Sequence, residues 1–106
     1  MSWNYSFDGA EVLEKAPVRV RPPRKWKVVL YNDDFTPMDF VVEVLMRFFG
    51  HSQSRASAIM WQVHKEGKGI CGIYPKEIAE TKMMQVNRYS RAHGHPLLCQ
   101  IEVDDE

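Results

Sequence analysis

The order of hydrophobic and polar residues predicts three strands and three helices between Trp26 and the C-terminus. Three short apolar runs are rich in β-branched or aromatic residues and are bounded by polar or glycine positions, which is typical of strands. These runs cover residues 26–32, 68–74 and 95–103. Gly72, inside the second run, indicates a β-bulge or a close approach by another backbone.

The first helix is expected between the first two strands, where apolar residues recur at helical spacing. Thr36 is a favourable N-cap, Pro37 suits the first helical position, and Asp39 completes a capping box. This helix should run to Phe49, because Gly50 is a typical C-terminal stop. The same helical spacing predicts two further helices along the chain.

The second helix should start at Ser52 or Ser54 and end at Gly67. A third helix is expected to open at Pro75 and to continue to about Ala92. Its inner face is predicted to consist of the apolar and small residues Ala79, Met83, Val86 and Ser90.

The resulting order is strand, helix, helix, strand, helix, strand, or βααβαβ. It predicts an α+β domain of two layers, in which three helices cover one face of a small three-stranded, mainly antiparallel sheet. With 106 residues the chain is long enough for a single domain. Pro22 and Pro23 disfavour helix and sheet pairing, so residues 1–23 are expected to form a flexible N-terminal extension and residues 24–106 the core domain.

Composition excludes several classes of partner and compartment. The 14 basic and 14 acidic residues cancel, so the chain has no long-range field that would attract nucleic acid or a membrane. The N-terminus lacks the apolar stretch of a signal peptide, and no segment is long enough to span a bilayer, so we expect a cytoplasmic protein. Cys71 and Cys99 are then best explained as small core residues. A monomer is expected, since no apolar seam is visible.

The segment NDDFTPM, residues 32–38, is the most unusual local feature. Asp33 and Asp34 with His64 or Glu66 would be a candidate acid–base site, but a domain of this size offers only a shallow pocket and no nucleophile motif is present. We therefore do not expect an enzyme. Ligand-type side chains match no zinc spacing, so neither a metal nor a cofactor is expected; they are His51, His64, His93, His95, Cys71 and Cys99.

Helical spacing suggests a different use for the acidic segment. Apolar residues of the first helix directly follow it, and one side of the second helix carries Met60, Val63 and His64. If these helices pack together, an apolar depression opens beside Asn32 and Asp33. A ligand for such a site has an ammonium group next to a bulky apolar side chain, as does a polypeptide that begins with Leu, Phe, Tyr or Trp. Turn chemistry remains the alternative explanation of the Asn and Asp residues.

Three stretches, WKVVLYNDDFTPMDFV, VHKEGKGICGIYPKEIAETK and HPLLCQIE, resemble the ClpS family of bacterial adaptors over about 80 of the 106 residues. Phe35 stands where this family commonly has Tyr. The resemblance implies an adaptor that captures N-degron polypeptides, which bear a destabilising N-terminal residue, and delivers them to the ClpA unfoldase of the ClpAP protease. It further implies a role for the N-terminal extension in delivery.

The resemblance also implies site residues. The ligands of the substrate amino group fall on Asn32, Asp33 and His64, with Asp34 and Thr36 shaping the same loop. The side-chain pocket of the family falls on Met38, Val41, Met60, Val63, Leu97 and Thr36. The surface that docks on the N-terminal domain of ClpA falls on Glu77, Glu80 and Lys82.

A second function class fits the same element order. It is a protein-interaction domain that docks on a larger assembly and has no degron pocket, and the fold alone does not choose between the two. The grouping of Asn32, Asp33, Met38 and His64 favours the degron adaptor, because docking alone leaves it unexplained.

Overall fold

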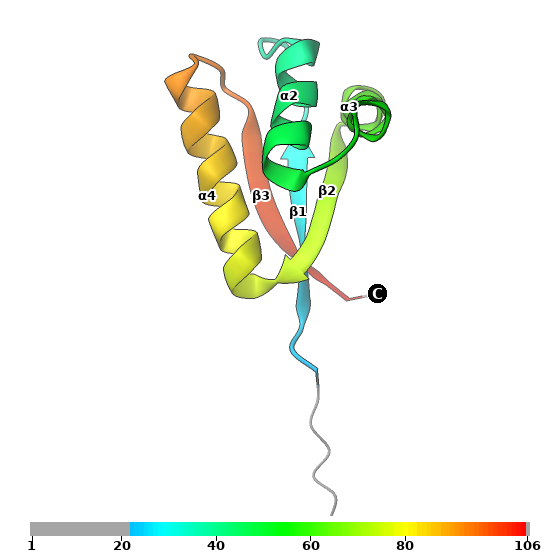
Figure 1. The fold of residues 1–106 in the computed structure, drawn as a ribbon, viewed down its shortest axis with the longest axis vertical. Coiled ribbons are helices and arrows are strands. Elements are labelled where there is room, and N and C mark those ends of the chain that lie inside the picture. The colour runs from blue at the N-terminus through cyan, green and yellow to red at the C-terminus, as the bar shows by residue number, and fades with distance from the viewer. Residues whose placement is uncertain (1–21, 106) are drawn as a thin grey trace, which may run out of the picture.

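The structure, a computed structural model, describes residues 22–105 of the chain. Figure 1 shows three helices and three strands in the order βααβαβ. The expected N-terminal extension lies almost wholly outside the described residues. The elements are β1 (Lys25–Tyr31), α2 (Met38–Phe49), α3 (Gln53–Glu66), β2 (Lys68–Pro75), α4 (Lys76–Ala92) and β3 (Leu98–Asp104).

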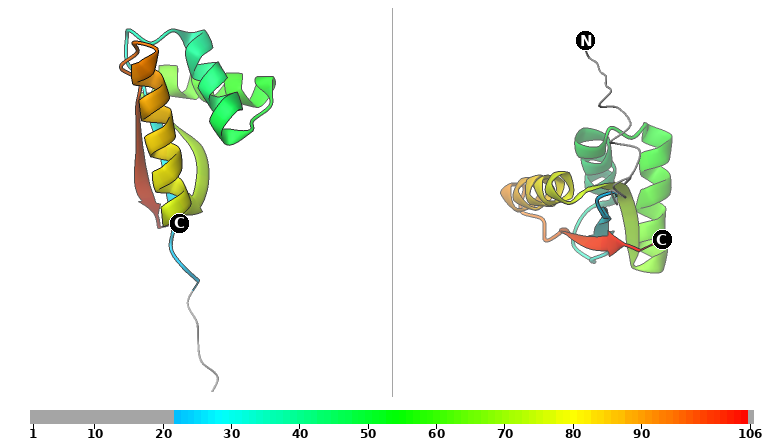
Figure 2. Two further views of the ribbon diagram at one scale, coloured as in Figure 1. Left: turned by 60° about the vertical axis from the view of Figure 1, so that its left-hand side comes forward. Right: turned by 90° about the horizontal axis from the view of Figure 1, so that it is seen from below.

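The three strands form one antiparallel sheet with β1 in the centre, in the order β2-β1-β3. Val28 of β1 lies opposite Gly72 of β2 and Ile101 of β3. Figure 2 shows the helices on one side of this sheet, with α3 next to β2 and α4 next to β3. The predicted α+β fold with a single helical layer is confirmed.

The hydrophobic core lies between the sheet and the helices. Alternate residues of β1 point into it, because successive side chains of a strand face opposite sides; Val28 and Leu30 are both fully buried. The helices contribute apolar residues at helical spacing, and those of α2 are Phe40, Val41, Val44 and Leu45. Of the predicted inner face of α4, Ala79, Val86 and Ser90 are buried, while Met83 packs partly exposed against the core.

Both cysteines are free and buried in the core, as expected from the sequence. Burial raises the pKa of both thiols, that of Cys99 to about 12, so neither is a thiolate at neutral pH. The Asn87 side chain holds the backbone of Cys99 with two hydrogen bonds of 2.9 Å each. Asn87 Oδ1 accepts from the Cys99 N–H, and Asn87 Nδ2 donates to the Cys99 carbonyl. Asn87 thereby satisfies backbone groups of β3 that the sheet leaves unpaired.

The ends of α2 and α3 that glycine and serine predicted are confirmed. Gly50 adopts a left-handed conformation with φ 69° after α2. Glycine adopts this conformation with the least steric strain, because it has no Cβ. Ser52 caps α3 by accepting a hydrogen bond from the Arg55 N–H at 3.2 Å. Gly67 ends α3 with φ 91°, and its N–H bonds the Val63 carbonyl.

The predicted N-terminus of α2 is wrong in detail. The helix begins at Met38, and the cap position is taken by Pro37, which makes no side-chain capping bond. Thr36 lies one position before the cap, and its hydroxyl donates to Asp33 Oδ2 at 2.7 Å. The capping box with Asp39 is therefore absent. The Thr36 hydroxyl bonds the Asp33 carboxylate of the acidic loop.

Two other boundaries differ from the prediction. Pro75 ends β2 and precedes α4, which begins at Lys76. The third strand begins at Leu98 and not at His95, because Arg91 Nη1 donates to the carbonyls of His95 and Leu97 at 3.0 and 2.6 Å. These bonds hold the connecting segment against the end of α4.

The bulge expected at Gly72 is present in β2. The pairing register with β1 shifts between Val28 and Val29, which leaves Cys71 as the extra residue. His51 Nε2 lies 2.7 Å from the Cys71 carbonyl oxygen and donates to it. The space at Gly72 is filled by the Tyr74 side chain, whose hydroxyl lies 2.6 Å from the position of an added Cβ, so the close approach comes from a side chain and not from a backbone.

Candidate functional site

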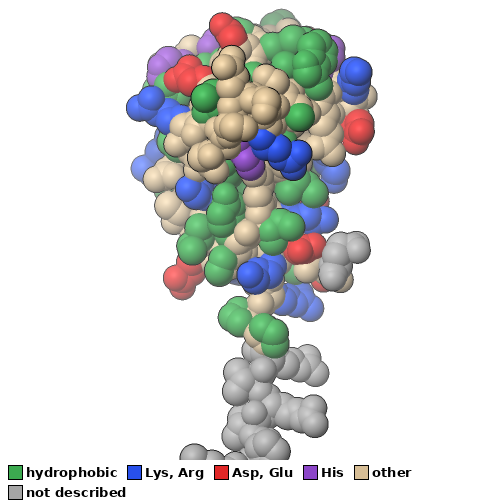
Figure 3. Space-filling view, turned by 45° about the vertical axis from the view of Figure 1, so that its right-hand side comes forward, with side chains coloured by type: hydrophobic (Ala, Val, Ile, Leu, Met, Phe, Trp, Pro, Cys, Tyr) green, Lys and Arg blue, Asp and Glu red, His purple; other side chains and the backbone are tan. Residues whose placement is uncertain are grey.

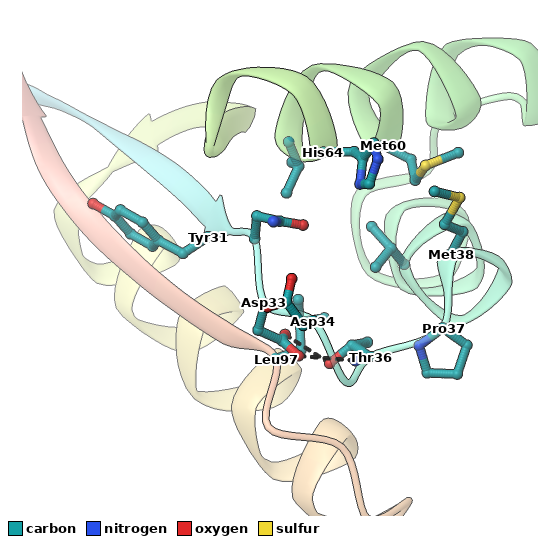
Figure 4. A pocket seen from close by; sticks show the side chains of 12 residues that line it. Tyr31, Asp33, Asp34, Thr36, Pro37, Met38, Met60, His64 and Leu97 are labelled. Atoms are coloured by element: carbon teal, nitrogen blue, oxygen red, sulfur yellow. Dashed lines mark hydrogen bonds between the residues drawn. The ribbon is translucent and has the colours of Figure 1, made fainter.

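A pocket of about 300 Å³ opens between the end of β1, the start of α2 and the C-terminal half of α3. Figure 4 shows the acidic loop on one side of it and His64 with Met60 on another. Every residue that the sequence assigned to amino-group binding or to the side-chain pocket lines this one cavity. The lining residues are Tyr31, Asn32, Asp33, Asp34, Thr36, Pro37, Met38, Val41, Met60, Val63, His64 and Leu97.

Asp33 organises the loop that borders the pocket. Its Oδ1 accepts hydrogen bonds from the N–H groups of Phe35 and Thr36 at 2.8 Å each, and its Oδ2 accepts from the Thr36 hydroxyl at 2.7 Å. Bonds from an aspartate to its own following backbone form a tight turn. The carboxylate is thus fixed in position, and its negative charge stays at the edge of the pocket.

Asn32 and His64 supply the other polar groups near this charge. The Asn32 N–H bonds the Gly67 carbonyl at 2.9 Å, which ties the end of β1 to the end of α3. Within residues 22–105, neither the Asn32 amide nor the His64 ring has a hydrogen bond to another side chain or to the backbone. Both groups are exposed and available to a ligand.

The rest of the pocket is apolar. Its walls come from α2, α3 and the segment before β3, and they are buried: Val41 is 6% exposed, Met60 7%, Val63 3% and Leu97 1%. Met38 is 40% exposed and lies at the mouth, where Figure 4 places it close to Met60. A bulky apolar group that enters the pocket therefore meets the flexible Met38 side chain at the mouth and buried apolar walls inside.

Sequence reasoning did not assign Tyr31 or Pro37 to the pocket. Tyr31 lines the pocket, but Figure 4 shows its ring turned away from the other labelled side chains. Its hydroxyl donates to Glu102 Oε2 at 2.6 Å, and Lys68 pairs with the same oxygen at 3.3 Å. The bond from Tyr31 lowers the pKa of Glu102, and the carboxylate raises the pKa of Tyr31. Both belong to the open face of the sheet.

The residues that the resemblance assigned to docking lie on α4, apart from the pocket. Glu77 and Glu80 are exposed. Lys82 is only half-exposed, because its ammonium donates to the Phe48 carbonyl at 2.6 Å and lies 5.8 Å from the centre of each of the Phe49 and Tyr74 rings. Lys82 therefore stabilises the C-terminus of α2 in the isolated domain. A cation is also favourable at this position because the helix dipole is negative at the C-terminus.

The residues that the structure describes include neither a cluster of metal-ligating side chains nor a helix of membrane-spanning type. Among residues 22–105, no three or more His, Cys, Asp or Glu side chains form a cluster that could hold a metal ion. His93 Nδ1 instead lies 2.9 Å from the Tyr89 carbonyl oxygen, at the end of α4. None of the helices described is long and apolar enough to cross a bilayer.

The geometry defines a small binding domain. Its pocket joins an apolar interior to a rim that carries a carboxylate, an amide and an imidazole, and this set of groups can accept hydrogen bonds from a cation. The chain belongs to the ClpS family, described as ATP-dependent Clp protease adaptor protein ClpS, whose family model matches residues 21–100.

Individual relatives agree with this assignment. The chain is 58% identical over 96 residues to the ATP-dependent Clp protease adapter protein ClpS of Hydrogenovibrio crunogenus, covering 91% of this chain and 92% of the relative. The ClpS of Vibrio atlanticus is 52% identical over 104 residues, covering 96% and 98%. These names describe an adaptor of a protease, so the expectation that the chain is not an enzyme is confirmed.

A solved structure has the same fold. Agrobacterium tumefaciens ClpS2 bound to L-phenylalaninamide matches with a TM-score of 0.77 at 32% identity, covering 78% of this chain and all of that one. The order of strands and helices predicted from the sequence and the resemblance to the ClpS family are both confirmed.

Proposed function

We propose that this protein binds the N-terminal residue of polypeptides that begin with Leu, Phe, Tyr or Trp and delivers them to the Clp protease. The observation that carries the proposal is the pocket itself: an apolar cavity of about 300 Å³ whose polar groups lie on its rim. An N-terminal residue has the same two parts, a cationic amino group and, one carbon away, an apolar side chain.

The ligand of the Agrobacterium relative supports this reading. L-phenylalaninamide, to which that protein is bound, has a free amino group and a benzyl side chain, as has a polypeptide that begins with Phe. That protein shares the fold, and the part of this chain that matches it is 32% identical in sequence. We infer that the pocket of this chain takes ligands of the same chemistry.

We assign recognition of the amino group to Asn32, Asp33 and His64. An α-amino group has a pKa of about 7.7 to 8.0 and is largely cationic at neutral pH, so it needs acceptors from the protein. Asn32 offers its amide oxygen, Asp33 its negative charge and the one remaining lone pair of Oδ2, and neutral His64 one ring nitrogen. Each charge-assisted bond contributes about 1.5 to 3 kcal/mol.

We assign the side-chain pocket to the apolar residues of the wall and mouth. Burying a Leu or Phe side chain contributes about 1.5 to 3 kcal/mol, against an association cost of at least about 4 kcal/mol. With three amino-group bonds and the burial each at the upper end of its range, about 8 kcal/mol remains, which corresponds to a Kd of about 1 µM. The residues are Met38, Val41, Met60, Val63 and Leu97, with Thr36 holding the loop.

We further propose that α4 docks on the N-terminal domain of the ClpA unfoldase through Glu77, Glu80 and Lys82. The two glutamates are free to form ion pairs, while Lys82 would have to release or share its bond to the Phe48 carbonyl. The N-terminal extension is proposed to act in delivery, and the protein to act as a monomer. We place it in the cytoplasm, where its two free cysteines would stay reduced.

A binding panel tests the function directly. Labelled peptides that are identical except for Leu, Phe, Tyr, Trp, Val or Ile at the first position are titrated with the full chain, and fluorescence anisotropy is measured. The first four are expected to bind with a Kd of about 1 µM or tighter, and Val and Ile at least about 10-fold more weakly. If none of the six binds, the pocket is not a degron site, and a domain that only docks on a larger assembly is the better reading.

Met38 is expected to exclude β-branched residues. We expect Met38→Ala to raise the affinity for the Ile and Val peptides at least about 10-fold, because a gatekeeper acts by steric clash and removing it admits the branched carbon. Met46→Ala is the matched control, since Met46 lies on the same helix, is 41% exposed and does not line the pocket. Continued rejection of Ile and Val by Met38→Ala would show that another residue sets the specificity.

A further inference from the structure

The orientation of the His64 ring is a problem that the pocket leaves open. To accept a hydrogen bond from an amino group, a ring nitrogen must point into the cavity, and an exposed histidine on a helix has several rotamers. In the part of the chain that the structure describes, no hydrogen bond fixes this ring. If one ring nitrogen is to stay directed into the cavity, a contact other than a hydrogen bond has to limit the rotation of the ring.

Trp61 makes the one ring contact of His64 within residues 22–105. The two ring centres are 5.7 Å apart and the planes are inclined by 78°, which is an edge-to-face arrangement. Residues three apart on a helix are neighbours on one face, so α3 alone places the indole beside the imidazole. Aromatic pairs prefer this geometry, and each contributes about 0.5 to 1.5 kcal/mol beyond burial.

Core packing does not explain Trp61. The residues of α3 that pack in the core are Ala56, Ile59, Met60 and Val63, whereas Trp61 is 46% exposed. Figure 3 shows hydrophobic side chains gathered at the upper end of the molecule, with a histidine and a basic side chain beside them. Trp61 lies outside the core and does not itself line the pocket, so a part in binding would act through its neighbour His64.

Lys65 makes a second contact with the indole. Its ammonium lies 5.8 Å from the centre of the Trp61 ring, a cation–π distance. Trp61 is therefore in contact with two consecutive residues of the next helical turn, His64 and Lys65. The indole has less freedom to swing away than an isolated exposed side chain.

We infer that Trp61 is a positioning residue of the amino-group site, which holds the His64 ring with one nitrogen directed into the pocket. This inference rests on the proposed function, because it assumes that His64 accepts a bond from the substrate. Trp61 itself touches no substrate group in this scheme and acts only through His64.

A double-mutant cycle tests the inference. The affinity for the peptide that begins with Phe is measured for the wild type, Trp61→Leu, Trp61→Phe, His64→Ala and the double variant Trp61→Leu with His64→Ala. Trp61→Leu is expected to weaken binding about 2- to 12-fold, the equivalent of one aromatic pair. Trp61→Phe should stay within about 2-fold of the wild type, because it keeps an aromatic edge contact. Circular dichroism and thermal unfolding confirm that each variant is folded.

The decisive readout is the behaviour of the double variant. Once His64 is absent, replacing Trp61 should have no further effect, because coupled residues are not additive. An equal loss in both backgrounds would mean that Trp61 contacts the peptide directly, and no loss in either would mean that His64 needs no support; both overturn the inference. Failure of the proposed function is distinguishable, since the wild type itself would then not bind the Phe peptide, and the inference would fall with it.

Discussion

Acetylation of the amino group is expected to weaken binding of a Phe-initiated peptide at least about 100-fold. It removes the positive charge and two of the donors, so at least two charge-assisted bonds of about 1.5 kcal/mol or more are lost, and 3 kcal/mol is more than a factor of 100. The acceptors on the rim of the pocket then face the acetylated amide of the peptide, and they lose the donors with which they would have formed hydrogen bonds. Fluorescence anisotropy with the free and the acetylated peptide measures the ratio.

The control for this experiment is a peptide that carries a lysine near its C-terminus, acetylated there and free at the N-terminus. It should bind as the unmodified peptide does, because only the first amino group lies in the site. If acetylation of the N-terminus changes the affinity less than about 3-fold, the apolar pocket alone would account for binding. The polar rim formed by Asn32, Asp33 and His64 would then have no part in recognition.

Asp33→Ala is expected to reduce the affinity for the same peptide at least about 30-fold, equivalent to about 2 kcal/mol. The carboxylate holds the loop through three hydrogen bonds, two from backbone N–H groups and one from the Thr36 hydroxyl. Its removal frees the loop and also deletes the negative charge beside the substrate amine. Titration by fluorescence anisotropy measures the loss, and circular dichroism checks the fold.

Two further variants separate the structural part from the charge. Asp33→Asn keeps an oxygen that can accept from the N–H groups of Phe35 and Thr36 but removes the charge, and Thr36→Val removes only the hydroxyl bond. If loop geometry dominates, Asp33→Asn will bind nearly as the wild type does; if charge dominates, it will resemble Asp33→Ala. An affinity of Asp33→Ala within about 3-fold of the wild type would contradict both roles.

Most of the fold follows from local patterns. The strand β1, the helices α2 and α3 and the stops at Gly50 and Gly67 lie where the alternation, the helical spacing and the glycines predicted them. Such features depend on residues that are near one another in the chain, since a helix or a turn is closed by hydrogen bonds over a few positions. The element order then leaves few ways to cover one small sheet.

Local rules were misleading where a distant or competing partner exists. Thr36 has the chemistry of an N-cap, yet its hydroxyl is taken by the Asp33 carboxylate. Lys82 has the chemistry of a free surface cation, yet it donates to the Phe48 carbonyl, 34 positions earlier in the chain. The first bond replaces an expected helix cap and the second joins α4 to α2, and neither geometry follows from the spacing of residues along the chain.

The candidate site divides in the same way. The amino acids themselves determine which side chains are available: an acidic turn, a methionine that starts one helix, and a histidine on the apolar side of another. Only the packed molecule decides that the end of β1, the two helices and the segment before β3 enclose one cavity, and that Tyr31 turns outward to Glu102. The physical reason is that side-chain identity is a property of each position, whereas a pocket is a property of the distances that long-range packing imposes.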